Sequence, residues 1–136
     1  MPNVYIETGK NIPPSRAGIS HAVVAGPICH IGGQLSIDLD GVFCPGTVQL
    51  QTKRSFDNFF AVLDEAGFMA TDIVYLELAF KNINDLGTVS SIYNTYFPEH
   101  FRPCRTVHQV SALPYNAKIR VHGVAIKTSA FKEIPC

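Results

Sequence analysis

Two helical segments, each with a single apolar stripe, most constrain the fold of this chain. In segment 47–66 the apolar side chains recur at the spacing of one helix face, and Gly67 follows where a C-terminal cap belongs. A second such segment begins at Asn84 and Asp85, residue types suited to a helix start, and ends before Pro98. Because each helix has only one apolar side, both are expected to pack on the same partner surface.

That partner surface is predicted to be a β-sheet. In 73–80, between the helices, large apolar side chains alternate with polar or smaller ones, which predicts a strand with one apolar face. Shorter runs of strand-forming residues lie on both sides of the helical segments, at 3–8, 20–25, 28–35, 106–110 and 118–127. The order β-β-β-α-β-α-β-β predicts an α/β fold of the α+β two-layer type, with both helices on one face of a mixed sheet.

Two adjacent glycines, Gly32 and Gly33, interrupt the predicted strand 28–35. Glycine inside a strand weakens it, so such a pair marks a bulge or a place where another group approaches the backbone closely. We therefore expect the ladder of hydrogen bonds to be irregular here.

The size and composition of the chain predict one domain that associates with itself. A length of 136 residues with 46% hydrophobic side chains fits a single domain, 1–136, with its core at about 3–128. No third helix is predicted for the second face of the sheet, and only 16% of residues are charged. Another copy of the chain is the economical cover for that face, so we expect a homo-oligomer.

Charge and patterning argue against several functional classes. Eleven basic and eleven acidic side chains give a formal charge of zero, which makes nucleic acid an unlikely partner. No apolar run approaches the roughly 20 residues that cross a bilayer, and the N-terminus lacks the pattern of a signal peptide, so we expect a cytoplasmic protein without membrane contact. The cysteines form no C-x-x-C pair, which argues against a disulfide framework or zinc knuckle; they are Cys29, Cys44, Cys104 and Cys136.

The segment 100–110, HFRPCRTVHQV, gathers most of the side chains that could carry chemistry. Cys104 lies between Arg102 and Arg105, and nearby cations favour a thiolate, but no partner base can be identified beside it. Arg105 opens a predicted strand, where its guanidinium could hold a carboxylate bidentately. A salt bridge to an acid such as Glu65 or Glu77 is the alternative for Arg105. The histidines lack the spacing of metal ligands, so no metal site is expected.

Motifs spread over 17–127 resemble those of the RidA family, also called YjgF, the reactive intermediate deaminases. AGISHAV is similar to the family's G-P-Y-S-Q-A-V, IGGQL to S-G-Q-I, and FFAVLDEAG to its first helix end. NINDL with YNTYF, and RPCRT followed by ALP, match further motifs in the same order. The order and spacing of these segments together identify the chain as a member of this family.

The resemblance implies a fold, an assembly and an activity. The fold is a chorismate-mutase-like sandwich, and three copies form a homotrimer that buries the bare sheet faces and creates clefts between subunits. Family members hydrolyse imines and enamines of 2-keto acids to the keto acid and ammonia, without a cofactor. Arg105 corresponds to the arginine that holds the carboxylate of this small metabolite, while Gly33 and Val107 correspond to positions that contribute backbone groups.

Several positions depart from the family pattern. Arg120 stands where deaminases place a glutamate thought to activate water, and His122 replaces another common glutamate. Ile19 replaces a cleft tyrosine, and Gly32 and Ser90 replace a serine and an asparagine. The predicted substrate-binding residues are therefore Arg105, Gly33, Val107, Ser90, Ile19 and Arg120, and the predicted catalytic residues are Arg105, Arg120 and His122.

The exchange of glutamate for Arg120 leads to a hypothesis about the ligand. Arg105 and Arg120 would repel each other unless an anion lay between them, so a ligand with more than one carboxylate would suit the site. His122 should share a strand face with Arg120 and is the candidate proton shuttle. The hypothesis fails if Arg120 points away from Arg105. In the alternative, Arg120 meets a neighbouring subunit's acid or solvent and the cleft performs no chemistry.

Three functions thus stand at this point. The leading one is hydrolysis of small 2-imino carboxylates in an intersubunit cleft. The second is binding or processing of another carboxylate by a branch of the family without deaminase activity, or a ligand-sensing role. The third is an endoribonuclease, which the neutral charge and the lack of a basic stripe with aromatics disfavour.

Overall fold

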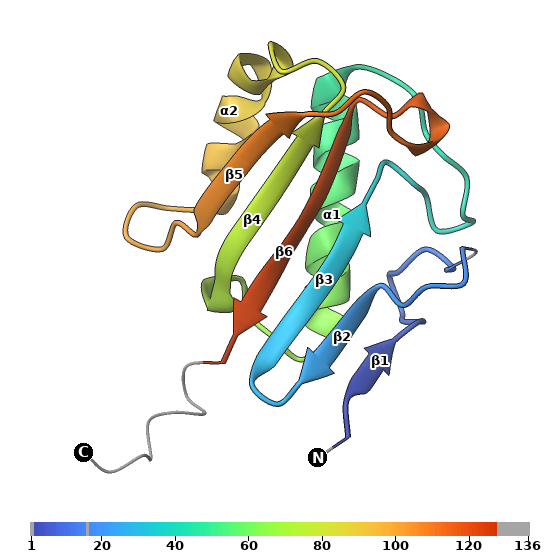
Figure 1. Ribbon diagram of the computed structural model, residues 1–136, viewed down its shortest axis with the longest axis vertical. Helices are drawn as coiled ribbons and strands as arrows, with labels where there is room; N and C mark the ends of the chain where they lie inside the picture. Colours follow the sequence, from blue (N-terminus) through green and yellow to red (C-terminus); the bar gives the residue numbers. More distant parts are fainter. Residues whose placement is uncertain (1, 16, 128–136) are drawn as a thin grey trace.

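The computed structural model describes residues 2–15 and 17–127, and it confirms the predicted order of elements. One six-stranded sheet forms a layer with the strand order β1-β2-β3-β6-β4-β5 (Figure 1). All neighbouring strands are antiparallel except β4 and β5, which are parallel and joined through a helix. The strands are β1 (Val4–Ile6), β2 (Ala22–Ala25), β3 (Ile28–Gln34), β4 (Ile73–Phe80), β5 (Cys104–Gln109) and β6 (Ile119–Ile126).

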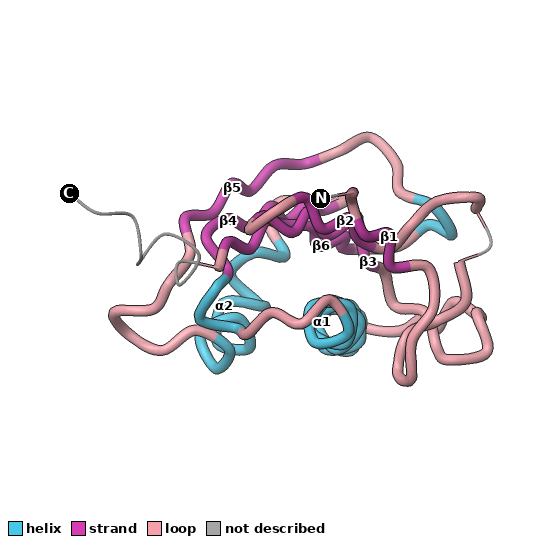
Figure 2. Tube along the Cα trace, turned by 90° about the horizontal axis from the view of Figure 1, so that it is seen from below, coloured by secondary structure: helices cyan, strands magenta, loops and turns pink. Residues whose placement is uncertain are grey.

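Both long helices, α1 (Val48–Glu65) and α2 (Asp85–Tyr96), cover the same face of the sheet (Figure 2). The C-terminal cap of α1 is as predicted, since Gly67 adopts a φ of 83°. At the start of α1 the Thr47 side chain accepts a hydrogen bond from the backbone N–H of Leu50, at 3.2 Å. The start of α2 differs. Asn84 occupies the N-cap position, but its side chain makes no capping hydrogen bond, because its backbone is helical rather than extended there.

The two glycines in β3 interrupt the ladder as expected. The register between β3 and β6 shifts between Ile31 and Gln34, which leaves Gly32 and Gly33 in an irregular stretch. The backbone N–H of Gly32 donates instead to the carbonyl of His21, at 2.8 Å. The bulge therefore lies at the end of β3 that leads into the loop before α1.

The main core lies between the helices and one sheet face. Leu76, Leu78 and Phe80 of β4 point toward the helices and are fully buried. On the helix side, aromatic rings pack in a mutually contacting group made of Phe56, Phe59, Phe60, Tyr93, Tyr96 and Phe97. This burial holds the helices on the sheet and fixes which residues of each strand face away from the helices.

Neither long helix lies on the second sheet face, where the loop after β5 runs instead (Figure 2). Leu113 and Ala117 of that loop form a small buried cluster with Leu35 and Ala79, and the rest of the face is uncovered in the described part of the chain. Among residues 2–15 and 17–127, no helix is long and apolar enough to cross a membrane. The expected homotrimer, which would cover this face, stays a prediction.

Gly123 of β6 gives a direct test of how tightly β6 and β4 pack. A Cβ at Gly123 would lie 2.4 Å from the backbone oxygen of Tyr75, whereas a Cβ at Gly87 in α2 would meet nothing within 4 Å. We expect Gly123→Ala to lower the free energy of unfolding by about 1–3 kcal/mol. The matched Gly87→Ala should raise it by about 0.5–1 kcal/mol, because alanine favours helix. Urea unfolding of both variants measures these changes in the free energy of unfolding. A Gly123→Ala protein as stable as the wild type would contradict this packing.

Candidate functional site

Arg105 lies on the edge strand β5, on the side of the sheet that faces the helices. It pairs in register with Leu76, a core residue, and its guanidinium carbon is 4.6 Å from the ring centre of Tyr93 on α2. Burial raises the pKa of the Tyr93 phenol, and the charge of Arg105 opposes that rise. The side chain of Arg105 is thus oriented by an aromatic ring while the residue remains exposed to solvent.

The alternative of a salt bridge for Arg105 is wrong for Glu77. Glu77 alternates with Leu76 along β4 and therefore faces the opposite side of the sheet. Among the ion pairs of the described residues, none involves Arg105, and Glu65 is not its partner either. Its guanidinium contacts Tyr93 and forms no ion pair within the described part of the chain.

Two other predicted site residues lie near Arg105. Val107 follows two positions along β5, points to the same side and packs at the margin of the main core. Ser90 lies one turn before Tyr93 on α2, and its hydroxyl donates to the carbonyl of Leu86, at 2.8 Å. We call Arg105, Val107 and Ser90 the β5 group.

The remaining substrate-binding candidates form a second group elsewhere. Gly33, Ile19 and Arg120 line one pocket of about 510 Å³ beside the end of β3, and we call them the β3 group. A Cβ at Gly33 would lie 2.6 Å from the Cδ of Arg120, so glycine is what lets the arginine stem lie against the backbone. The Nε of Arg120 is buried and has no hydrogen-bond partner among the described residues.

Arg120 and Arg105 point to opposite faces of the sheet. Arg120 pairs with Ala79, which alternates with core residues along β4, while Arg105 pairs with Leu76 on the core side. The hypothesis of a dicarboxylate held between the two arginines therefore fails by its own criterion. Its physical basis was the proximity of two like charges, and the strand parity removes that proximity within the chain.

His122 shares the face of Arg120, as predicted, and is bound by a carboxylate that the sequence did not single out for this role. His122 Nε2 donates to Glu77 at 2.8 Å, and His108 Nδ1 donates to the other oxygen of Glu77 at 3.2 Å. The hydroxyl of Tyr75 also donates to Glu77, at 3.2 Å. The alternating pattern of β4 could have placed Glu77 on the polar side of the sheet. Its partners could not be predicted, because they depend on the register of β4 with β5 and β6.

This arrangement fixes the imidazole of His122. With Nε2 donating to Glu77, the neutral ring carries its proton there, and Nδ1 is left as a hydrogen-bond acceptor. A carboxylate in this position also stabilises the imidazolium that forms when the ring takes up a proton. His122 can therefore serve as a base, with Glu77 as its positioning residue.

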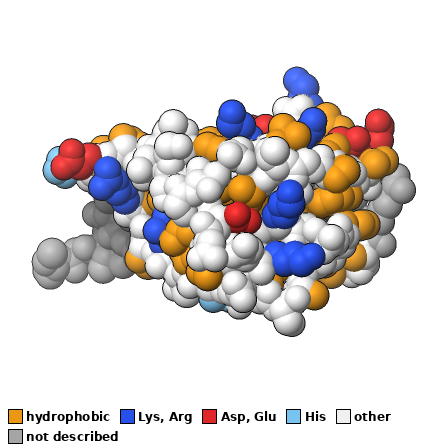
Figure 3. All heavy atoms as spheres, turned by 90° about the horizontal axis from the view of Figure 1, so that it is seen from above, with side chains coloured by type: hydrophobic (Ala, Val, Ile, Leu, Met, Phe, Trp, Pro, Cys, Tyr) orange, Lys and Arg blue, Asp and Glu red, His pale blue; other side chains and the backbone are white. Residues whose placement is uncertain are grey.

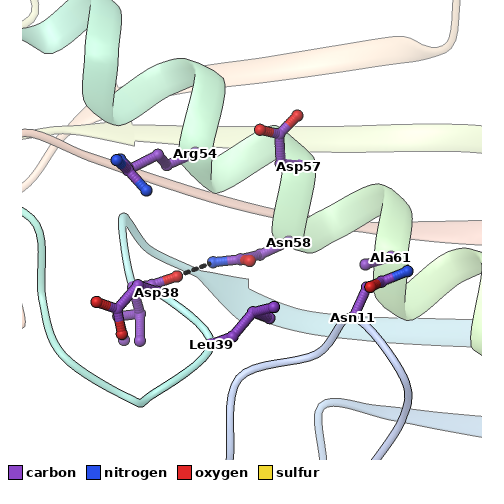
Figure 4. Close-up of a pocket in the computed structure, with 8 residues that line it drawn as sticks. Asn11, Asp38, Leu39, Arg54, Asp57, Asn58 and Ala61 are labelled. Atoms are coloured by element: carbon purple, nitrogen blue, oxygen red, sulfur yellow. Dashed lines mark hydrogen bonds between the residues drawn. The ribbon is translucent and has the colours of Figure 1, made fainter.

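Another pocket, of about 300 Å³, lies between α1 and the loop after β3 (Figure 4). Asn58 donates to the carbonyl of Ile37 at 2.9 Å across it, and Arg54 and Asp57 point away from each other. This pocket holds none of the predicted site residues. Within the described ranges, no group of three or more His, Cys, Asp or Glu side chains is arranged to hold a metal ion.

Known proteins resemble the chain over most of its length. Residues 9–127 match the family model described as Endoribonuclease L-PSP. A rat protein named 2-iminobutanoate/2-iminopropanoate deaminase is 33% identical over 123 residues, covering 90% of this chain and 88% of that protein.

Solved structures give the same result for the fold. YyfA of Yersinia pestis, described as a protein of unknown function of the conserved Rid family, matches with a TM-score of 0.86 and 30% identity, over 93% of this chain and 100% of that one. TdcF of E. coli, solved with bound serine, matches with a TM-score of 0.82 and 26% identity, over 90% and 98%.

The cysteines are expected to differ sharply in reactivity. Cys104 is exposed, and its thiol donates a hydrogen bond to the carbonyl of Val74, at 3.1 Å. Cys29 is fully buried, and burial raises its pKa to about 11, so about one thiol in a thousand is ionised at pH 8. Alkylation at pH 8, followed by peptide mass spectrometry, should modify Cys104 long before Cys29. Equal rates would show that the β2–β3 core opens readily. Cys136 lies outside the described residues.

Proposed function

We propose that this chain, which belongs to the Endoribonuclease L-PSP family, the RidA family, hydrolyses 2-imino and enamine carboxylates to 2-keto acids and ammonia at a site shared between two copies. The observation that carries the proposal is the division of the predicted site residues into the β5 group and the β3 group. Each group holds an arginine, and neither contains a complete set of substrate-binding and catalytic side chains.

The distance between the groups favours a shared site. β5 and β3 are separated by β4 and β6, so at roughly 4.8 Å per strand Arg105 is about 14 Å from Gly33 on β3 and about 10 Å from Arg120 on β6 across the sheet. The two groups also lie toward opposite faces. A second copy that packs on the uncovered sheet face could place its edge strand β5 beside the β3 group, and a closed trimer of such contacts would satisfy all three copies.

The chemistry follows from the charges and tautomers already described. Arg105 of one copy would bind the carboxylate of the substrate. His122 Nδ1, held by Glu77, would accept a proton from the water that attacks the C=N carbon. That proton would pass to the imine nitrogen to give the carbinolamine. The hydroxyl proton of the carbinolamine would then pass through His122 to the nitrogen as the C–N bond breaks, which leaves the keto acid and ammonia. Arg120 beside Gly33 would favour the negative charge that develops on the attacking oxygen.

The alternatives have less support. A non-catalytic, ligand-binding member would fit the loss of the glutamate at 120, but the base that Glu77 and His122 provide would then be without use. An endoribonuclease needs a continuous basic surface, whereas the formal charge is zero and Figure 3 shows basic side chains interspersed with apolar and acidic ones. Deamination is therefore the function we propose.

Arg105→Ala should abolish most of the activity. Freshly generated 2-iminopropanoate, assayed for accelerated release of the keto acid, should show a loss of roughly 100-fold in kcat/KM, or about 3 kcal/mol, because a charge-assisted pair of hydrogen bonds is lost. Arg102→Ala, which removes the neighbouring exposed arginine, is the matched control and should keep most of the activity. If Arg105→Ala is as active as the wild type, the proposed role of Arg105 is wrong.

Mixed assemblies test whether the site is shared. Gly33→Val should displace Arg120 and inactivate the β3 group, whereas Arg105→Ala inactivates the β5 group. If copies are unfolded and refolded together in equal amounts, about a quarter of the sites should combine two intact groups, so about a quarter of wild-type activity should return. A mixture as inactive as its two components would place both groups of one site in the same chain.

A further inference from the structure

The pocket beside the β3 group is larger and more apolar than a methyl or ethyl group requires. Its volume of about 510 Å³ falls in the range of pockets that enclose whole organic ligands, roughly 300–1,000 Å³. We infer that the substrate carries a bulky apolar side chain, aromatic or branched, which this pocket encloses. The inference rests on the proposed function and adds the substrate class.

Two walls of the pocket expose large apolar side chains to water. Ile19 and Tyr115 are 59% and 61% exposed, among the most exposed of the large apolar residues. A ligand that covers both recovers the free energy of burying apolar surface, which a small polar ligand would not. The other apolar lining residues are Pro13, Pro14, Ala17, Leu35, Ile37 and Pro114.

Tyr115 is held as a fixed wall by an unusual backbone. Its φ of 59° and ψ of 18° lie in the left-handed region, which a bulky residue adopts only where its surroundings enforce it. The turn is closed by a hydrogen bond from Ala117 N–H to the Pro114 carbonyl, at 3.1 Å. The ring stacks on Phe43 at 5.5 Å between centroids and 8° between planes. The left-handed backbone of Tyr115 thus holds its aromatic ring at the wall of the pocket.

The wall that carries Pro13 is fixed by a histidine. His21 Nε2 donates to the Pro13 carbonyl at 2.8 Å, and the Gln34 side chain donates to His21 Nδ1 at 3.4 Å. Because both walls are held before a ligand arrives, little ordering cost opposes binding.

One end of the pocket is cationic. Arg120 lines it, and its buried Nε lacks a hydrogen-bond partner among the described residues. A buried donor of this kind needs an acceptor oxygen. A cation at one end and apolar walls at the other fit an amphipathic monocarboxylate. Its polar end would lie toward Arg120 and the Arg105 of a second copy, and its side chain toward Tyr115.

A series of imines with growing side chains tests the inference. An L-amino acid oxidase can generate imines from alanine, 2-aminobutyrate, leucine and phenylalanine in the assay. We expect kcat/KM to be at least tenfold higher for the benzyl than for the methyl compound. Equal or better hydrolysis of the methyl compound would overturn the substrate class while leaving the proposed deaminase function intact.

The variant Tyr115→Asn isolates the aromatic wall. Asparagine tolerates the left-handed backbone, so the turn should fold, which the thermal midpoint checks. The ratio of kcat/KM for benzyl over methyl should fall at least fivefold. The matched control Met69→Asn alters a side chain that is 68% exposed, in the loop between α1 and β4. Figure 1 shows this loop at the opposite end of the sheet from the connection between β5 and β6, so the ratio should be unchanged. An unchanged ratio in Tyr115→Asn would contradict the inference.

Binding of stable analogues separates the pocket from the reaction. 3-Phenylpropionate should raise the thermal midpoint of the wild type more than propionate does, and the difference should vanish in Tyr115→Asn. If this holds while no imine is hydrolysed, the proposed function fails and the apolar pocket stands. If the two acids stabilise the protein equally, the pocket inference fails, whatever the outcome of the hydrolysis assay.

Discussion

The packing of α1 and α2 on a single face of the sheet is the constraint on which the rest of the structure depends. As a result, alternate side chains along each strand point either into the buried core or toward the uncovered face of the sheet. Arg105 and Val107 fall on the helix side at the sheet margin, and Arg120 and His122 fall on the other. The division of the candidate site into two groups is a direct result of this one-sided burial.

The polar side chains on the uncovered face differ from those expected for the family. The chain lacks the glutamate that relatives in the deaminase branch are expected to carry in the last strand, yet it carries Glu77 on the neighbouring strand, bound to two imidazoles. A carboxylate bound by two ring N–H groups acts by orienting His122, and it is less able to meet substrate itself. The proposed reaction would therefore depend on an imidazole base that shares a sheet face with Arg120.

Local patterns in the sequence were enough to predict the fold, but the site depends on pairings between strands. Helical spacing placed α1 and α2 within a residue or two, the glycine pair predicted the bulge in β3, and parity within β6 placed Arg120 and His122 together. The alternation of side chains within one strand does not give its register with the next strand. The sequence therefore could not show that Arg105 and Arg120 point to opposite faces, nor which residues bind Glu77. The left-handed backbone of Tyr115 carries no signal, because such positions usually hold glycine or asparagine.

The close approach of Arg120 to Gly33 also restricts how this protein could have acquired its arginine. A Cβ at 33 would lie 2.6 Å from the Cδ of Arg120, so any larger residue there requires the arginine stem to move from its present place. The residues at the two positions are therefore expected to depend on each other during divergence. A residue larger than glycine at 33 should accompany a smaller side chain at 120, or an arginine that lies elsewhere.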